Sequence, residues 1–179
     1  MRLYLAVLPP EDITREINQI RKALGETTRN PPHVTLRSSF TTNTYEELVE
    51  DLKTIRTPPL TLTFEEYTLF DDEFLVLLAR KAPELMGLEA QVVTIAERHR
   101  IRETVEREGL DPMQQRYLET YGTPFVFEYY NPHLTLTSTK PEQHDVGRIL
   151  PFSFRADAIS IIEKRDYTIK DRIPLSREP

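Results

Sequence analysis

The sequence predicts one compact domain that mixes helices with strands and is built from two similar halves. Segments with period-two apolar alternation and segments with helical spacing take turns along the chain. The phrase PPHVTLRSSF, which begins at Pro31, returns as NPHLTLTSTK at Asn131. The length of 179 residues suits one domain over residues 1–179, with lobes of about 1–82 and 83–179 and terminal strands free to cross between them.

We expect four strands and two helices in the first half. Alternation and β-branched residues predict strands, and apolar residues three or four apart predict helices. These patterns place strands at 2–8, from about His33, at 60–70 and at 74–81, and helices over 13–24 and 44–56. At the start of the second helix, Thr44 and Glu47 form a capping-box pattern.

The second half predicts further helices and strands. A helix from Pro83 to about Arg102 carries a stripe of apolar residues, and His99 falls in its register, so we expect His99 to border the core. Beyond it the patterns predict a short helix in 111–122, a strand on the second phrase, a short polar helix over 141–150 that holds His144, and closing strands around 156–165 and 167–175. His99 and His144 are more typical of structural and surface positions than of catalysis.

Composition narrows the class of function. With no cysteine, disulfides, thiolate catalysis and cysteine-ligated metal are excluded. The net charge of −6 disfavours wrapping of long nucleic acid, but it is compatible with a small phosphate ester or an RNA end held in a local positive pocket. No apolar run is long enough to cross a bilayer and the N-terminus lacks a signal-sequence pattern, so we expect a cytoplasmic protein without a membrane partner. No obligate protein partner is indicated.

The repeated phrase places the same kinds of side chain on one face of two strands. Because side chains alternate in a strand, His33, Thr35 and Arg37 share a face in the first copy. His133 and Thr135 share the matching face in the second copy, and the intervening aliphatic residues point the other way. If the two faces meet across a groove, the site has two imidazoles, at least two hydroxyls and one guanidinium.

This set of groups suits in-line displacement at a phosphodiester. A neutral imidazole accepts the proton of the attacking water, and an imidazolium donates a proton to the leaving oxygen. The hydroxyls of Thr35 and Thr135 can donate to the non-bridging oxygens, and Arg37 adds a fixed positive charge. The arrangement requires no metal and no cofactor.

Other interpretations of the same residues stay open. The repeat can be structural, with a histidine at the start of each duplicated strand. His33 and His133 can ligate a metal, although no third ligand repeats with them. Tyr129 and Tyr130, next to the second phrase, can stack on a base or pack into the core.

The phrases HVTL and HLTL, on strands about a hundred residues apart, resemble the paired H-x-T motifs of the two-histidine (2H) phosphoesterase superfamily. The opening RLYLAVLPP is similar to that of its LigT-like branch, the bacterial 2′,5′ RNA ligases and cyclic phosphodiesterases, and PPHVTLRSSF is similar to the small YjcG-like members. The resemblance implies a bilobal α+β fold in which two antiparallel β-sheets form a central groove, with helices packed outside. The internal repeat would then be related by a pseudo-two-fold axis.

The resemblance also implies a metal-independent hydrolase of 2′,3′-cyclic phosphodiesters in nucleotides or RNA ends, with 2′,5′ RNA ligation as the reverse reaction. The family's catalytic histidines map onto His33 and His133, and its threonines onto Thr35 and Thr135. We expect His133 to act as the base and His33 to protonate the leaving 3′ oxygen. The alternatives are a 3′ RNA exonuclease of the same superfamily, a non-catalytic module that binds a phosphorylated ligand, and a metal-dependent hydrolase. The long charged stretch over about 102–130 is unlike a minimal member and leaves the substrate open.

Overall fold

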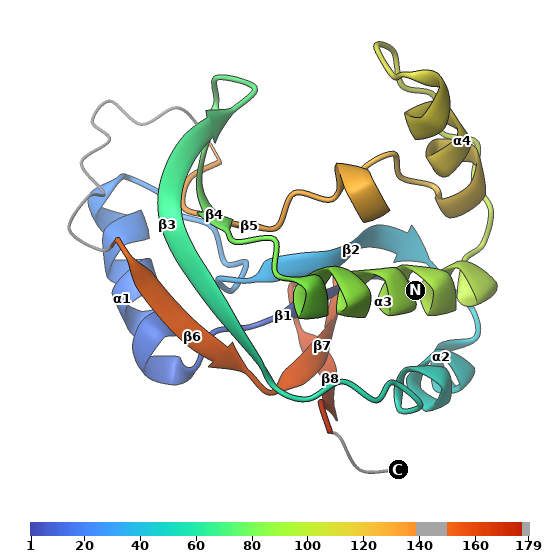
Figure 1. The fold of residues 1–179 in the computed structure, drawn as a ribbon, viewed down its shortest axis with the longest axis horizontal. Helices are drawn as coiled ribbons and strands as arrows, with labels where there is room; N and C mark the ends of the chain where they lie inside the picture. The colour runs from blue at the N-terminus through green and yellow to red at the C-terminus, as the bar shows by residue number, and fades with distance from the viewer. Residues whose placement is uncertain (139–149, 177–179) are drawn as a thin grey trace.

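The computed structural model describes residues 1–138 and 150–176, and these residues form an α+β fold around one curled antiparallel sheet (Figure 1). The α+β class expected from the sequence is thus confirmed. The sheet has eight strands in the order β6-β3-β4-β5-β2-β1-β7-β8. Their bounds are β1 (Arg2–Val7), β2 (Val34–Thr41), β3 (Leu60–Phe70), β4 (Phe74–Ala79), β5 (His133–Thr135), β6 (Phe152–Ala156), β7 (Ala158–Glu163) and β8 (Ile169–Pro174).

One continuous sheet stands where two antiparallel sheets were expected. The short strand β5 makes the connection, because it pairs with β4 on one side and with β2 on the other. Strands of the two sequence halves interleave, since β6 pairs with β3 and β7 lies between β1 and β8. The two-sheet, bilobal description and the pseudo-two-fold repeat are therefore not confirmed.

Helices α1 (Glu11–Ala23), α2 (Tyr45–Leu52) and α3 (Pro83–His99) cover one face of this sheet. The other helical segments are α4 (Pro112–Tyr121) and the 3₁₀ turn η1 (Phe127–Tyr129). Apolar residues of α1, α2 and α3 form one core with the inward residues of the central strands, among them Ile17, Leu48, Leu88, Val34 and Leu134. Helix α4 stands apart from this core, near the ends of α3 and β2 (Figure 1).

The capping box predicted at the start of α2 does not form, and its threonine instead contacts the end of α3. Thr44 makes no side-chain cap bond to α2. Its Oγ1 lies 3.0 Å from Nδ1 of His99, whose Nε2 lies 2.9 Å from Oδ2 of Asp51. The hydroxyl has another partner, and His99 ties the end of α3 to α2 beside the core, as its register predicted.

Two other expectations need correction, and a third falls outside the described residues. The second phrase forms a strand of only three residues, His133–Thr135. The closing segment holds three strands rather than two, because Phe152–Ala156 pairs with β3 before the chain turns into β7. The predicted helix over 141–150, with His144, lies outside the described residues apart from its last position.

Candidate active site

The two repeated phrases lie side by side in the sheet. Val34 of β2 is the partner of Leu134 of β5, and both are fully buried in the core. Antiparallel partners run in opposite order, so the next positions on the other face also meet across the strand pair. The register brings together two histidine–threonine pairs, Thr35 with His133 and His33 with Thr135.

The two phrases are also buried alike. Over residues 32–38 and 132–138 the order of burial is the same. In each copy the histidine and the threonine are half-buried, the serine at the end is exposed, and the other four residues are buried. The half-buried positions are His33, Thr35, His133 and Thr135. The imidazoles and threonines are therefore partly exposed, while the aliphatic residues between them are buried in the core.

Each histidine is oriented by a backbone carbonyl two residues earlier. Nδ1 of His33 lies 2.7 Å from the carbonyl oxygen of Pro31, and Nδ1 of His133 lies 2.7 Å from that of Asn131. A carbonyl oxygen can only accept, so Nδ1 carries the hydrogen in both rings. Nε2 of each neutral imidazole is then the basic nitrogen, available for proton transfer.

Both imidazoles pack against an aromatic ring, and burial favours their neutral form. The ring of Tyr4 lies 5.0 Å from that of His33, and the ring of Phe70 lies 4.8 Å from that of His133, centroid to centroid. Burial, and then the nearby Arg21, His133 and Lys164, together lower the pKa of His33 to about 4, against the hydrogen bond to Pro31, which raises it. Burial also lowers the pKa of His133. Both rings are therefore proton acceptors near neutral pH in the free protein.

Side chains from distant elements hold the threonine carbonyls. Arg21 of α1 donates from Nε and Nη2 to the carbonyl oxygen of Thr135, at 3.2 and 2.6 Å. The hydroxyl of Tyr130 donates to the carbonyl oxygen of Thr35 at 2.7 Å. Sequence analysis missed both contacts, since a side chain 114 residues from its acceptor leaves no local pattern. These bonds fix the two phrases from outside the sheet ladder.

The two tyrosines before the second phrase differ in position. Tyr130 is buried, with 7% of its surface exposed, and its hydroxyl is occupied by Thr35. Tyr129 is half-buried and donates to Oδ2 of Asp111 at 2.6 Å. Both line the cleft described below, and stacking on a base stays a prediction that fits Tyr129 better.

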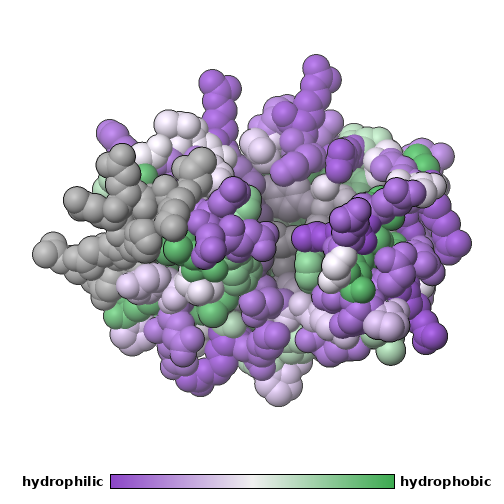
Figure 2. All heavy atoms as spheres, turned by 90° about the horizontal axis from the view of Figure 1, so that it is seen from above, coloured by the Kyte–Doolittle hydropathy of each residue, from purple (hydrophilic) through white to green (hydrophobic). Residues whose placement is uncertain are grey.

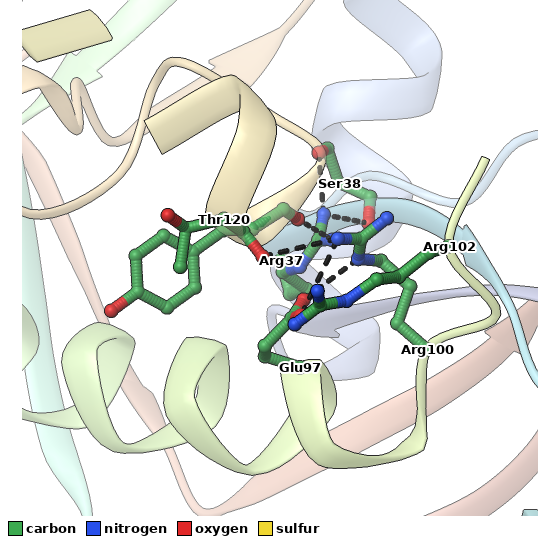
Figure 3. Close-up of polar contacts among 7 residues, drawn as sticks. Arg37, Ser38, Glu97, Arg100, Arg102 and Thr120 are labelled. Carbon is green, nitrogen blue, oxygen red and sulfur yellow. Dashed lines mark hydrogen bonds and ion pairs between the residues drawn. The ribbon is translucent and has the colours of Figure 1, made fainter. Parts of the chain in front are cut away.

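Arg37 lies deeper than simple alternation predicts. Only 1% of its surface is exposed, and its Nη1 donates to the carbonyl and hydroxyl oxygens of Ser38, both at 2.9 Å. Its Nη2 donates to the carbonyl oxygen of Tyr121 at the end of α4. The pairing of β2 with β1 shifts register on both sides of Arg37, so strict alternation does not hold there. The guanidinium ties β2 to α4 (Figure 3).

A cleft opens beside the second histidine. Its volume is about 610 Å³, within the range of about 300–1,000 Å³ typical of small-molecule sites. Aromatic side chains, polar groups and one arginine line it, including Thr35, His133, Phe70, Phe125, Tyr129 and Arg107. Figure 2 shows a hollow near the centre of this face with hydrophilic side chains around its rim.

Neither a metal cluster nor a membrane span is found in the described part of the chain. Within residues 1–138 and 150–176, no three His, Cys, Asp or Glu side chains are grouped so that they could hold a metal ion. Over the same ranges, no helix combines the length and apolar character that crossing a bilayer requires.

The fold and the paired phrases are those of the two-histidine phosphoesterases. Residues 9–168 match the family model described as the 2′-5′ RNA ligase superfamily, and the chain belongs to that family. A comparison with curated protein sequences found no match.

Solved structures support the same fold. Escherichia coli LigT complexed with phosphate superposes with a TM-score of 0.62 at 17% identity, covering 98% of this chain and 97% of that one. TT0787 of Thermus thermophilus gives 0.63 at 16% identity over 100% of both chains. Usb1 of Kluyveromyces marxianus gives 0.52 at 12% identity, over 97% of this chain and 98% of that one. At these identities the likeness concerns the fold.

Proposed function

We propose that this protein is a metal-independent phosphodiesterase that opens 2′,3′-cyclic phosphodiesters of nucleotides or RNA ends, with His33 and His133 as its acid–base pair. One observation carries the proposal. Two imidazoles from paired segments of the sheet have the same carbonyl bond at Nδ1, which leaves Nε2 as the basic atom of each, and one of the two, that of His133, lines a cleft of nucleotide size. Family membership supports it, as do LigT structures described as complexed with phosphate and with 3′-AMP.

The proposed reaction is one in-line displacement. A water oxygen attacks the phosphorus while Nε2 of one histidine takes its proton. The bond between phosphorus and the leaving ribose oxygen breaks, and the second histidine, as imidazolium, gives its proton to that oxygen. The product is a ring-opened phosphomonoester. The hydroxyls of Thr35 and Thr135, on the same face, donate to the non-bridging oxygens, where negative charge is concentrated.

The surroundings of the two histidines favour one assignment of roles. His33 has a pKa of about 4, and the proximity of His133 contributes to lowering it. His33 is hard to protonate, so it is neutral before the reaction and can accept a proton as the base. The anionic phosphate of the substrate raises the pKa of His133, whose pKa is less perturbed, and His133 can then donate a proton as the acid. The electrostatics of the free protein thus favour His33 as base and His133 as acid, the reverse of the order expected from the sequence.

One assay tests the proposal. The protein is incubated with a nucleoside 2′,3′-cyclic phosphate and with a short RNA ending in a cyclic phosphate, each with and without EDTA. Ring opening that survives EDTA is the expected result. Activity abolished by EDTA would contradict the metal-independent mechanism, and binding without turnover would identify a ligand-binding module. Stepwise shortening of the RNA from its 3′ end would identify an exonuclease instead.

Three finer points stay predictions within this proposal. Arg37 was expected to contact the reacting phosphate, and it lines a recess next to the cleft. Tyr129 is the candidate for stacking on a base. A cytoplasmic location is expected from the sequence.

A further inference from the structure

A recess rich in arginine adjoins the cleft. Its volume is about 230 Å³, and its lining includes Arg2, Arg37, Arg100 and Arg107, which together we term the arginine recess. Glu103 is the one acidic side chain among its lining residues within the described part of the chain. In a chain with a net charge of −6, four guanidinium groups around one small cavity form a local region of opposite sign.

Two of the arginines belong to the framework. Nε of Arg100 donates to Oε2 of Glu97 at 2.7 Å, and its Nη2 donates to the carbonyl oxygen of Thr120 at 3.0 Å. Arg37 binds the next carbonyl, that of Tyr121. Figure 3 shows both guanidinium groups gathered next to Glu97 at the end of α4. The recess is therefore held by rigid contacts between β2, α3 and α4.

Gly122 makes this close approach sterically feasible. It ends α4 in the left-handed conformation, with φ of +70°. A Cβ at this position would lie 3.0 Å from Nη1 of Arg100. A larger residue would be strained in its backbone and would press against the guanidinium.

The positive charge of the recess is incompletely balanced. Burial, and then the charge of Arg100, lower the pKa of Arg37 to about 10. Within the described residues, Nε of Arg37 is buried without a hydrogen-bond partner. Glu97 is shared between Arg100 and Arg102. Such an arrangement of like charges favours a bound anion.

The two exposed arginines have weaker attachments. Nη2 of Arg2 lies 3.4 Å from Oγ of Ser39, and Cζ of Arg107 lies 4.6 Å from the ring centroid of Phe125. In the part of the chain that the structure describes, neither forms an ion pair with a carboxylate. A ligand can therefore bind both guanidinium groups without first breaking an ion pair, at the expense of only these weak contacts.

The recess and the cleft share part of their lining. Ser38, Arg107 and Thr123 border both. An extended ligand that lies in the cleft, such as an oligonucleotide, can thus continue past Arg107 into the recess.

We infer that the arginine recess binds a second phosphate of the substrate, in the nucleotide next to the one that bears the reacting phosphate. The preferred substrate is then an oligonucleotide ending in a cyclic phosphate rather than a cyclic mononucleotide. A guanidinium group matches the geometry of a phosphate with paired donors, and the framework contacts keep two of the four groups in place. This inference rests on the proposed function and extends it to the substrate class.

Equilibrium binding tests the inference without relying on turnover. The probes are a nucleoside 3′-monophosphate and the matching ribodinucleotide 3′-monophosphate, titrated calorimetrically at several salt concentrations. We expect the dinucleotide to bind about tenfold tighter or more, the size of one charge-assisted hydrogen bond. Arg2→Ala and Arg107→Ala should each reduce that ratio and lower the salt dependence of dinucleotide binding.

Arg98→Ala is the matched control. It removes the same charge from an exposed arginine on α3, whose Nη1 lies 3.9 Å from Asp51, outside the recess. It should leave the ratio of the two affinities unchanged, and circular dichroism checks that each variant is folded.

The outcomes separate this inference from the proposed function. Equal affinities for the two probes, or a ratio that neither recess variant changes, would overturn the inference even if cyclic nucleotides are hydrolysed. An arginine-dependent preference for the dinucleotide supports the recess even if no turnover is seen, and turnover is measured separately with the cyclic substrates. Binding of inorganic phosphate that depends on Arg2 and Arg107, without a dinucleotide preference, would identify a free-anion site and overturn the inference.

Discussion

Each of the two histidines is held by the carbonyl two residues before it. This short-range bond orients the imidazole and leaves Nε2 as the basic atom, independently of the rest of the site. The proline between the carbonyl and the histidine has no N–H and restricts the backbone at this point. The sequence pattern proline–histidine–aliphatic–threonine therefore specifies a side-chain conformation as well as a strand.

Removal of either imidazole should stop turnover of a cyclic phosphate. We expect His33→Ala and His133→Ala each to lower kcat by roughly 10²–10⁴-fold, the usual contribution of a general acid or base. The double variant should lose less than the product of the two, because the residues act as a unit. A single variant that keeps the wild-type rate would contradict the paired mechanism.

The assignment of acid and base has its own test. A phosphodiester with an aryl leaving group does not need protonation of the leaving oxygen. If His133 is the acid, His133→Ala should retain activity on the aryl ester close to wild type, whereas His33→Ala should not. Kinetics of both variants on both substrates decide this, and the opposite pattern of rescue would restore the order expected from the sequence.

The buried imidazole of His33 should make the protein less stable in acid. Its pKa of about 4 in the folded state lies below the value of about 6.5 in the unfolded chain, so the unfolded chain binds more protons between these values. The free energy of unfolding should therefore fall as the pH drops from 6.5 to 4. Urea titrations at pH 7 and pH 4.5 measure this decrease. The free energy of unfolding should decrease less in His33→Gln than in the wild-type protein, and an equal decrease in both would contradict the assigned pKa.

At the scale of elements, a carboxyl group under the cleft holds the turn η1. Both side-chain oxygens of Glu89 on α3 lie 3.3 Å from the backbone nitrogen of Phe127, which has a positive φ of 55°. Glu89 is fully buried. Burial raises its pKa to about 7, against the attraction of Arg37 and the bond from Phe127. One wall of the cleft thus depends on a carboxyl group that the fold prefers to keep protonated.

Replacement of Glu89 by Gln should stabilise the protein at alkaline pH. The folded-state pKa of about 7 lies above the unfolded value of about 4.5, so this group contributes stability that is lost as the pH rises from 4.5 through 7. Glutamine keeps an acceptor for Phe127 and never ionises. We expect Glu89→Gln to raise the free energy of unfolding at pH 8 by about 1 kcal/mol or more, with little change at pH 4.5. A stability difference that is the same at both values would contradict this.

Predictions of helices and caps succeeded where the contacts involved are local in sequence and failed where a distant residue takes part. Helix α4 is capped by residues next to it in the sequence. The side chain of Asp111 accepts from the backbone nitrogens of Met113 and Gln114 at its start, and Gly122 ends it. The same kind of pattern at Thr44 failed because its hydroxyl is bound to His99, 55 residues away. Local signals hold where no distant partner competes for the same atom.

At the scale of the whole molecule, the continuity of the sheet predicts a single unfolding transition. Strand β5 has only three residues, yet it connects β4 and β2 and lies between strands of the first half. Alone, the first half would keep only the separate pairs β1–β2 and β3–β4, and the second half only β7–β8, so the sheet is continuous only when both halves are folded. Urea unfolding followed by tyrosine fluorescence and by far-ultraviolet circular dichroism should give coincident midpoints, whereas two separated transitions would show that the halves unfold independently.

Local patterns were enough to predict most helices and strands, the repeated phrase and, apart from Arg37, the side chains that share its half-buried face. Apolar periodicity reports which face of an element is buried, and that information is contained in residues close together in the chain. The pairing of β2 with β5, the bonds from Arg21 and Tyr130 to the threonine carbonyls, and the burial of Arg37 depended on residues brought together from far apart. Such contacts arise from the packing of the folded chain, which no short-range pattern encodes.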